Sequence, residues 1–205
     1  MKTIKLIPAL LLIAFIYSCS SPKKEKENIT NPQKESIVTN KVVKEITNEE
    51  FKDFLSNLSF IEIPYETSCD SNYKQDYEMS EELIEKFSER KFQYPYKRVY
   101  TPENFEIVIF LSPADVIIPI VRTFDLNGNP IASEQMFHGY CGGEPGYYHT
   151  EHIQIVSPDL ITHIDSTWTH EVDEDYNEIK GTEKFKLEVY DFIINKDGTI
   201  TKKEE

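Results

Sequence analysis

Glycine and basic side chains are scarce in this sequence, and both shortages limit what the chain can be. Seven glycines in 205 residues leave little room for long flexible loops inside a folded domain. Lysine and arginine number 22 against 36 acidic residues, which gives a formal net charge of −14. Binding to nucleic acid or to anionic lipid headgroups depends on basic side chains, so this balance argues against both. The acidity instead suits solubility and the attraction of cations or of a basic partner.

Long apolar runs are also lacking, apart from one near the amino terminus. That run, residues 6–17, is shorter than the roughly 20 residues that a bilayer-spanning helix needs. It follows a short basic stretch, residues 1–5, and has the length of the hydrophobic region of a signal peptide. The sequence therefore predicts an exported protein.

The end of this run, Ile16-Tyr17-Ser18-Cys19, resembles the lipobox of bacterial lipoproteins. The resemblance implies that the signal peptide, residues 1–18, is removed and that Cys19 is acylated. Each buried CH₂ contributes about 0.8 kcal/mol, so several acyl chains would hold the protein on a membrane. Ser20 resembles the outer-membrane sorting pattern, which implies the outer membrane of a Gram-negative cell envelope. A secretory signal with an incidental cysteine and an uncleaved anchor are the alternatives.

Residues 19–45 are polar and charged, with few apolar side chains before Val42. Such a segment cannot bury enough apolar surface to offset its ordering entropy, so we interpret it as a flexible tether after the acylated cysteine. Residues 46–205 are enough for one core, because a domain of about 150 residues buries close to 70% of its unfolded surface. We therefore expect a single β-rich globular domain.

Alternating β-branched and aromatic residues predict that strands make up most of this domain. Apolar residues at helical spacing predict two short helices, 48–57 and 81–90, the second capped by Ser80. The expected fold class is α+β and mainly antiparallel β, a β-meander sheet with two short helices near its N-terminal side. The predicted strands are 60–64, 105–111, 116–124, 131–137, 152–156, 160–172, 185–194 and 199–201. This layout behind a lipobox resembles small bacterial lipoproteins with a β-rich C-terminal domain.

Two cysteines remain in the predicted domain, Cys69 and Cys141, both in expected loops. Thiols outside the cytoplasm tend to be oxidised, and two cysteines are what one disulfide requires. We predict that they are bonded to each other. Two free buried thiols, or a metal-binding or reactive role, are the alternatives.

The loop with the most glycines also carries several tyrosines. Tyrosine rings favour interfaces, because they combine a large apolar body with a polar tip. We take this loop as the candidate contact surface for a protein or glycan partner, and expect the two tyrosines after the glycines to be exposed. The alternative is cross-strand packing of the rings. The residues concerned are Tyr140, Gly142, Gly143, Tyr147 and Tyr148.

Three histidines near this loop, His138, His149 and His152, are the candidate metal ligands. In a strand His149 and Glu151 would share one face and His152 would lie opposite, so His149 and His152 bind one ion only from a turn. Surface or cross-strand histidines are the simpler interpretation, and no cofactor is predicted. Farther along, His163 and Asp165 would share a face of the next strand, but no Gly-x-Ser-x-Gly motif marks a hydrolase.

No catalytic residue follows from these patterns. The expected function is that of a membrane-anchored envelope lipoprotein whose domain acts as a non-enzymatic binding or assembly module. One alternative is an envelope hydrolase or metal-dependent enzyme that uses the histidines around His149. Another is an inhibitor or immunity-type protein whose acidic face covers a basic partner.

Overall fold

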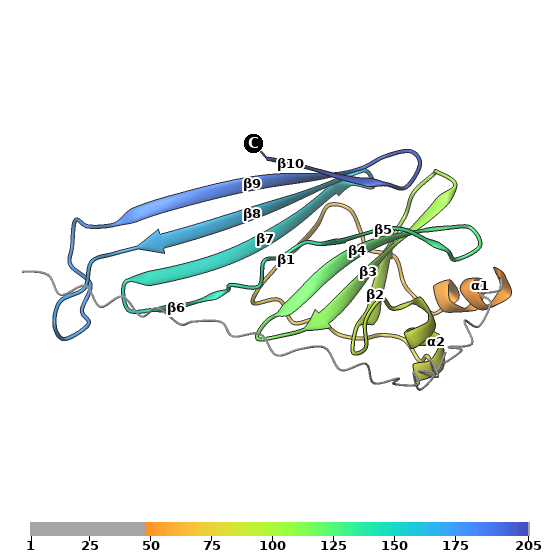
Figure 1. Cartoon of the computed structure of the whole chain (residues 1–205), viewed down its shortest axis with the longest axis horizontal. Coiled ribbons are helices and arrows are strands. Elements are labelled where there is room, and N and C mark those ends of the chain that lie inside the picture. Colours follow the sequence, from red (N-terminus) through yellow and green to blue (C-terminus); the bar gives the residue numbers. More distant parts are fainter. Residues whose placement is uncertain (1–47, 205) are drawn as a thin grey trace, which may run out of the picture. The chain divides into compact units, whose positions relative to one another are not determined.

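The structure is a computed structural model, and it describes residues 48–204 (Figure 1). The predicted signal peptide, Cys19 and the tether lie outside these residues. No helix in the described part of the chain is long and apolar enough to cross a bilayer.

Antiparallel strands dominate the described residues, and two short helices precede most of them. The mainly antiparallel α+β class predicted from the sequence is therefore confirmed. The helices are α1 (Asn48–Ser56) and α2 (Glu81–Phe87), and the strands are β1 (Tyr65–Ser68), β2 (Tyr94–Val99), β3 (Phe105–Pro113), β4 (Ile117–Asp125), β5 (Pro130–Gln135), β6 (Gly142–Glu144), β7 (Tyr147–Ser157), β8 (Leu160–Thr169), β9 (Lys184–Ile194) and β10 (Ile200–Glu204).

The strands form two sheets and not the single meander sheet that the sequence suggests. The smaller sheet has the order β2-β3-β4-β5. The larger has the order β1-β7-β8-β9-β10, and β6 adds to the end of β7 (Figure 1). The chain therefore enters the larger sheet with β1, builds the smaller sheet, and then returns to complete the larger one.

The main core lies between the two sheets. Its side chains come from the inward faces of both sheets, including Ile107 and Ile109 of β3 and Ile153, Ile161 and Phe192 of the larger sheet. Each of these five side chains is at most 3% exposed. Burial of apolar surface on this scale is the main force that holds the two sheets face to face.

A second core lies between the helices and the outer face of the smaller sheet. Phe51 and Phe54 of α1 and Phe87 of α2 pack on Phe110 and Phe124, with ring centroids between 4.6 and 6.3 Å apart. Strands β3 and β4 are consequently buried on both faces, which explains why their sequences are apolar on both. The layers are thus helices, smaller sheet and larger sheet.

Local signals place the second helix correctly but not its end. The Ser80 hydroxyl accepts a hydrogen bond from the Leu83 N–H, as predicted for a capping residue. The helix ends at Phe87 and not at residue 90, because Ser88 is extended and its hydroxyl donates to the Ile84 carbonyl. A serine that satisfies a terminal carbonyl in this way stops the helix.

In the first half of the domain one predicted strand is wrong, and two strands that the structure contains are not predicted from the sequence. Residues 60–64 form no strand, since Phe60 makes only an isolated bridge with Arg98. The aromatic segment that follows α2 instead supplies edge strand β2, which pairs with β3. Strand β1 is absent from the predicted strands as well, and it lies at the edge of the larger sheet beside β7.

A disulfide joins Cys69 and Cys141, whose Cα atoms are 6.0 Å apart. Cys69 directly follows β1, and Cys141 directly precedes β6, so the bond fastens the edge of the larger sheet to the loop that crosses it. The backbone N–H of Cys69 also donates to the Glu151 carbonyl of β7. The predicted disulfide between Cys69 and Cys141 is therefore confirmed in this structure.

Candidate functional site

Five ionisable side chains gather where the loop before β6 crosses the inner face of β7 and β8. We call them the buried cluster: His138, His149, Glu151, His163 and Asp165. Glu151 of β7 lies directly opposite Asp165 of β8, and Ile153 lies opposite His163. Side chains two residues apart share a face of a strand. This register therefore brings His149 and Glu151 of β7 to the same side of the sheet as His163 and Asp165 of β8.

Glu151 anchors the crossing loop to the sheet. Its carboxylate is fully buried, at 0% exposure, and accepts the backbone N–H groups of three consecutive residues. The N–H of His138 donates to Oε2 at 2.6 Å, and those of Gly139 and Tyr140 donate to Oε1 at 2.8 and 3.1 Å. A carboxylate that gathers three donors in this way fixes the position of the whole loop segment.

The same contacts keep Glu151 ionised. Burial on its own raises the pKa of this carboxyl, because a charge is costly away from water. The His163 imidazole and the backbone N–H groups of His138, Tyr140 and Gly139 outweigh the burial and lower the pKa to about 2. The cluster therefore contains a permanent negative charge at neutral pH.

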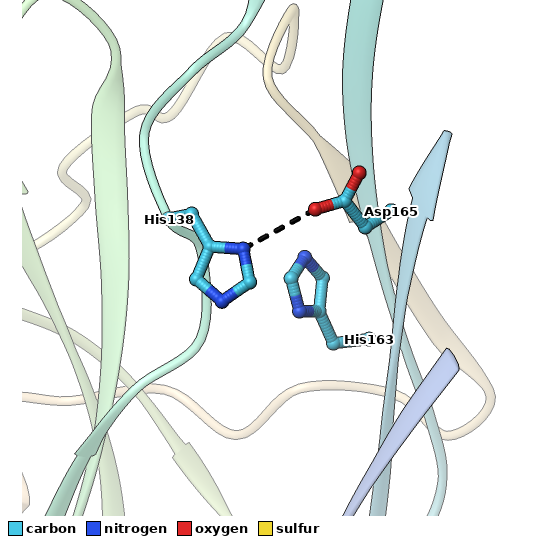
Figure 2. A group of neighbouring side chains, drawn as sticks. All are labelled: His138, His163 and Asp165. Carbon is cyan, nitrogen blue, oxygen red and sulfur yellow. Dashed lines mark hydrogen bonds and ion pairs between the residues drawn. The ribbon is translucent and has the colours of Figure 1, made fainter. Parts of the chain in front are cut away.

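Asp165 holds two histidines, one on each carboxylate oxygen. His149 Nε2 lies 2.7 Å from Oδ1, and His138 Nδ1 lies 3.2 Å from Oδ2. Figure 2 shows the ring of His138 and the carboxylate of Asp165 turned toward each other, with the ring of His163 beside them. Asp165 and His149 are buried, whereas the side chain of His138 is 38% exposed.

His163 is the most deeply placed histidine, at 1% exposure. Its ring stacks against Tyr190, with centroids 5.6 Å apart, and meets the edge of His138 at 5.1 Å. His163 Nε2 lies 2.9 Å from Glu151 Oε2, yet the N–H direction does not fit a hydrogen bond, so the two groups are close without being bonded. Neither ring nitrogen has a hydrogen-bond partner among the described residues.

The third histidine predicted as a metal ligand, His152, lies apart from the cluster. It is exposed on the opposite face of β7, as alternation along a strand requires. Two of the three candidate histidines, His138 and His149, lie in the buried cluster, but the sequence pattern does not connect them with His163 and Asp165. Ser166 is on the face opposite to Asp165, so β8 does not assemble a Ser-His-Asp arrangement.

The predicted tyrosine surface is exposed, but the sheet divides it. Tyr140, Tyr147 and Tyr148 are 71%, 38% and 48% exposed, which confirms the expected exposure of the two tyrosines after the glycines. Tyr140 and Tyr147 lie on the same side as His149, each with its ring centroid 6.4 Å from the imidazole. Tyr148 is on the other face.

Tyr148 begins a row of rings across three strands, which we call the aromatic row: Tyr148, Trp168 and Phe185. These residues are directly opposite one another in β7, β8 and β9. The centroids of Tyr148 and Trp168 are 5.7 Å apart, and those of Trp168 and Phe185 are 4.9 Å apart. Phe185 is 56% exposed, so the row presents apolar surface to solvent.

The two glycines predicted in the contact surface pair with β7 as part of β6. Gly142 is opposite His149, and Gly143 is opposite Tyr148. A Cβ atom on Gly143 would lie 2.9 Å from the carbonyl oxygen of Tyr147 and 3.0 Å from the Tyr148 ring. Glycine is therefore needed here so that β6 can approach the tyrosines.

Comparison of the chain with protein families, with curated proteins and with solved structures found no match in any of the three. One ring nitrogen each of His138 and His163 and one oxygen of Asp165 lie within 4.8 Å of one another. A second group, Cys141, His149 and Glu151, is equally close, but the Cys141 sulfur is bonded to Cys69 and cannot act as a thiolate.

Proposed function

We propose that the chain is a lipid-anchored envelope protein whose β domain binds a basic protein partner through the aromatic row. Cys19 would carry the lipid, and residues 19–45 would tether the domain to the outer membrane. The exposed ring row, at the end of the larger sheet, is the observation that carries this proposal. Aromatic rings that remain exposed to solvent are typical anchors of protein interfaces.

The surroundings of the row favour a basic partner over a neutral one. The loop between β8 and β9, residues 170–183, joins the strands that carry Trp168 and Phe185, and it contains six acidic residues and one lysine. Figure 1 places this loop at the same end of the larger sheet. Nearly all of its residues are exposed.

Rings and acidic groups complement the same kind of partner. Lysine and arginine side chains stack on aromatic faces with about 0.5–2 kcal/mol each, and their charge is attracted by the acidic loop. The overall charge of −14 also attracts a basic partner, over longer distances. An inhibitor or immunity-type role for a basic enzyme would be one form of this function.

Affinity capture from native envelopes tests the partner, with the full-length acylated chain as bait. We expect a basic protein that is released by raised salt and that is lost with Tyr148→Ser. Tyr100→Ser is the matched control, because Tyr100 is 63% exposed but lies after β2 on the smaller sheet. Equal capture by both variants, or recovery of glycan without protein, would remove the proposal.

The anchor is tested separately by detergent partitioning and mass spectrometry. The mature chain should begin at Cys19, carry fatty acids and enter the detergent phase, and Cys19→Ser should move it to the aqueous phase. A mature form that retains residues 1–18 would contradict lipidation. The outcome does not depend on the aromatic row, so the two halves of the proposal fail independently.

A further inference from the structure

We propose that His138, His163 and Asp165 form a binding site for a divalent first-row transition metal ion, with Glu151 and His149 as positioning residues. The site is separate from the aromatic row, which lies on the other face of the larger sheet. Two imidazoles and one carboxylate are a ligand set that such ions accept, and Zn²⁺ is the simplest probe of it.

The spacing of the three groups suits one ion. At bond lengths of about 2.0–2.1 Å, neighbouring ligand atoms in a tetrahedral zinc site are about 3.3 Å apart. His138 Nδ1 and Asp165 Oδ2 are already 3.2 Å apart, and one nitrogen of each histidine and one oxygen of Asp165 all lie within 4.8 Å of one another. Small rotations of the two rings would therefore complete the set, and Figure 2 shows the three side chains around a common centre.

The second observation is that neither ring nitrogen of His163 makes a hydrogen bond to another described residue, although Nε2 approaches the Glu151 carboxylate to 2.9 Å. A buried polar group without a hydrogen bond costs about 1–3 kcal/mol, so such groups call for a reason. His163 is 1% exposed, and neither of its ring nitrogens has a hydrogen-bond partner among the described residues. A bound cation would satisfy one of these nitrogens with a much stronger interaction.

Charge balance favours a dication. Glu151 and Asp165 bring two carboxylates into a buried space, and buried charges are normally paired or bound to metals.

The remaining two members of the buried cluster act on the ligands. His149 Nε2 is 2.7 Å from Asp165 Oδ1, which leaves Oδ2 directed to His138. Glu151 holds the backbone of the loop that carries His138. Partners of this kind orient metal ligands, and losing one typically weakens metal binding about 10- to 100-fold.

Access to the site comes through His138, the one ligand with an exposed side chain, at 38%. Three protein ligands leave a position on a tetrahedral ion for water or for a group from a bound molecule. The disulfide removes Cys141 as a competing ligand from the neighbouring group.

The experiment uses the full chain without a histidine tag, after a chelator has removed any bound metal. Calorimetry measures the binding of ZnCl₂, and visible absorption measures the binding of Co²⁺. We expect one ion per chain, and His138→Gln should weaken binding by at least about 100-fold. His152→Gln is the matched control, because His152 is an exposed histidine of the neighbouring strand β7, on the face opposite to the site. It should bind as the wild type does.

His138→Gln changes a partly exposed side chain, so circular dichroism should show an intact fold and the comparison remains valid. No bound ion in the wild type would overturn the site, and so would equal losses in the two variants or no loss in either. Because the aromatic row is untouched, partner capture and metal binding can succeed or fail separately.

Discussion

Replacing Glu151 by glutamine should both destabilise the domain and alter its response to acid. The carboxylate is fully buried and accepts three consecutive backbone N–H groups. A glutamine side chain keeps one acceptor oxygen, but its amide nitrogen would face a backbone donor. At least one N–H would then be left buried without a partner, which costs about 1–3 kcal/mol.

The charge adds a contribution that depends on pH. The folded pKa of Glu151 is lowered from 4.5 to about 2. At about 1.4 kcal/mol per pKa unit, this shift contributes about 3 kcal/mol to the free energy of unfolding at neutral pH. Solvent screening near the exposed His138 reduces the contribution to about 2 kcal/mol. Because the folded pKa is the lower one, this stability is present above pH 4.5 and is lost as the pH falls toward 2.

Urea unfolding of wild type and Glu151→Gln between pH 2 and 7 measures both effects, with the disulfide intact. We expect the variant to be about 2–4 kcal/mol less stable at pH 7, with the difference shrinking by about 2 kcal/mol at the acid end. Glu188→Gln, opposite Asp165 but 39% exposed, is the control and should stay within about 0.5 kcal/mol of wild type. Equal stability at pH 7, or parallel acid curves for wild type and Glu151→Gln, would refute this reasoning.

Two further predictions concern the framework around the site. Exchanging both Cys69 and Cys141 for serine should lower the free energy of unfolding by up to about 4 kcal/mol, since the bond closes a loop with a sequence separation of 72; unchanged urea midpoints would mean that no bond forms. Gly128→Ala should cost about 2–4 kcal/mol, because φ is +87° and the new Cβ would lie 2.7 Å from the Phe51 ring. Gly181→Ala has the same backbone strain, at φ +86°, but its new Cβ would meet open space. Thermal melts should therefore show about half the loss of stability, and equal losses for the two variants would exclude the contact with Phe51 as a cause.

Much of the fold follows from local patterns in the sequence. The Ser80 cap, the apolar face of the first helix and strands β8 and β9 lie close to their predicted positions, whereas β7 begins at Tyr147 and not at residue 152. The division into two sheets does not follow from them. A short, half-polar strand such as β1 has no periodic signal of its own, and it becomes a strand because β7 offers an unpaired edge.

The buried cluster depends on a feature that residue types do not reveal. Ser157 pairs with Leu160 across the turn, but the register shifts by one residue between Ile155 and Ser157. Without this bulge Glu151 would lie opposite Ser166, and Asp165 would point to the other face. A shift of one residue therefore decides whether the carboxylates and imidazoles meet.

The loop contribution to the cluster is equally non-local. His138 reaches the sheet because its backbone N–H and those of the next two residues bind the Glu151 carboxylate, 13 residues farther along the chain. The disulfide at Cys141 holds the end of the same loop. The spacing of His138 and His149 suggested a site near this loop, but the partners on β8 come from tertiary pairing.

Anomalous X-ray scattering from crystals of the full chain grown with Zn²⁺ tests the metal site most directly. Data collected on either side of the zinc absorption edge should show one strong peak bounded by His138, His163 and Asp165. A peak at His152 or at surface carboxylates, with none between these three side chains, would contradict the account.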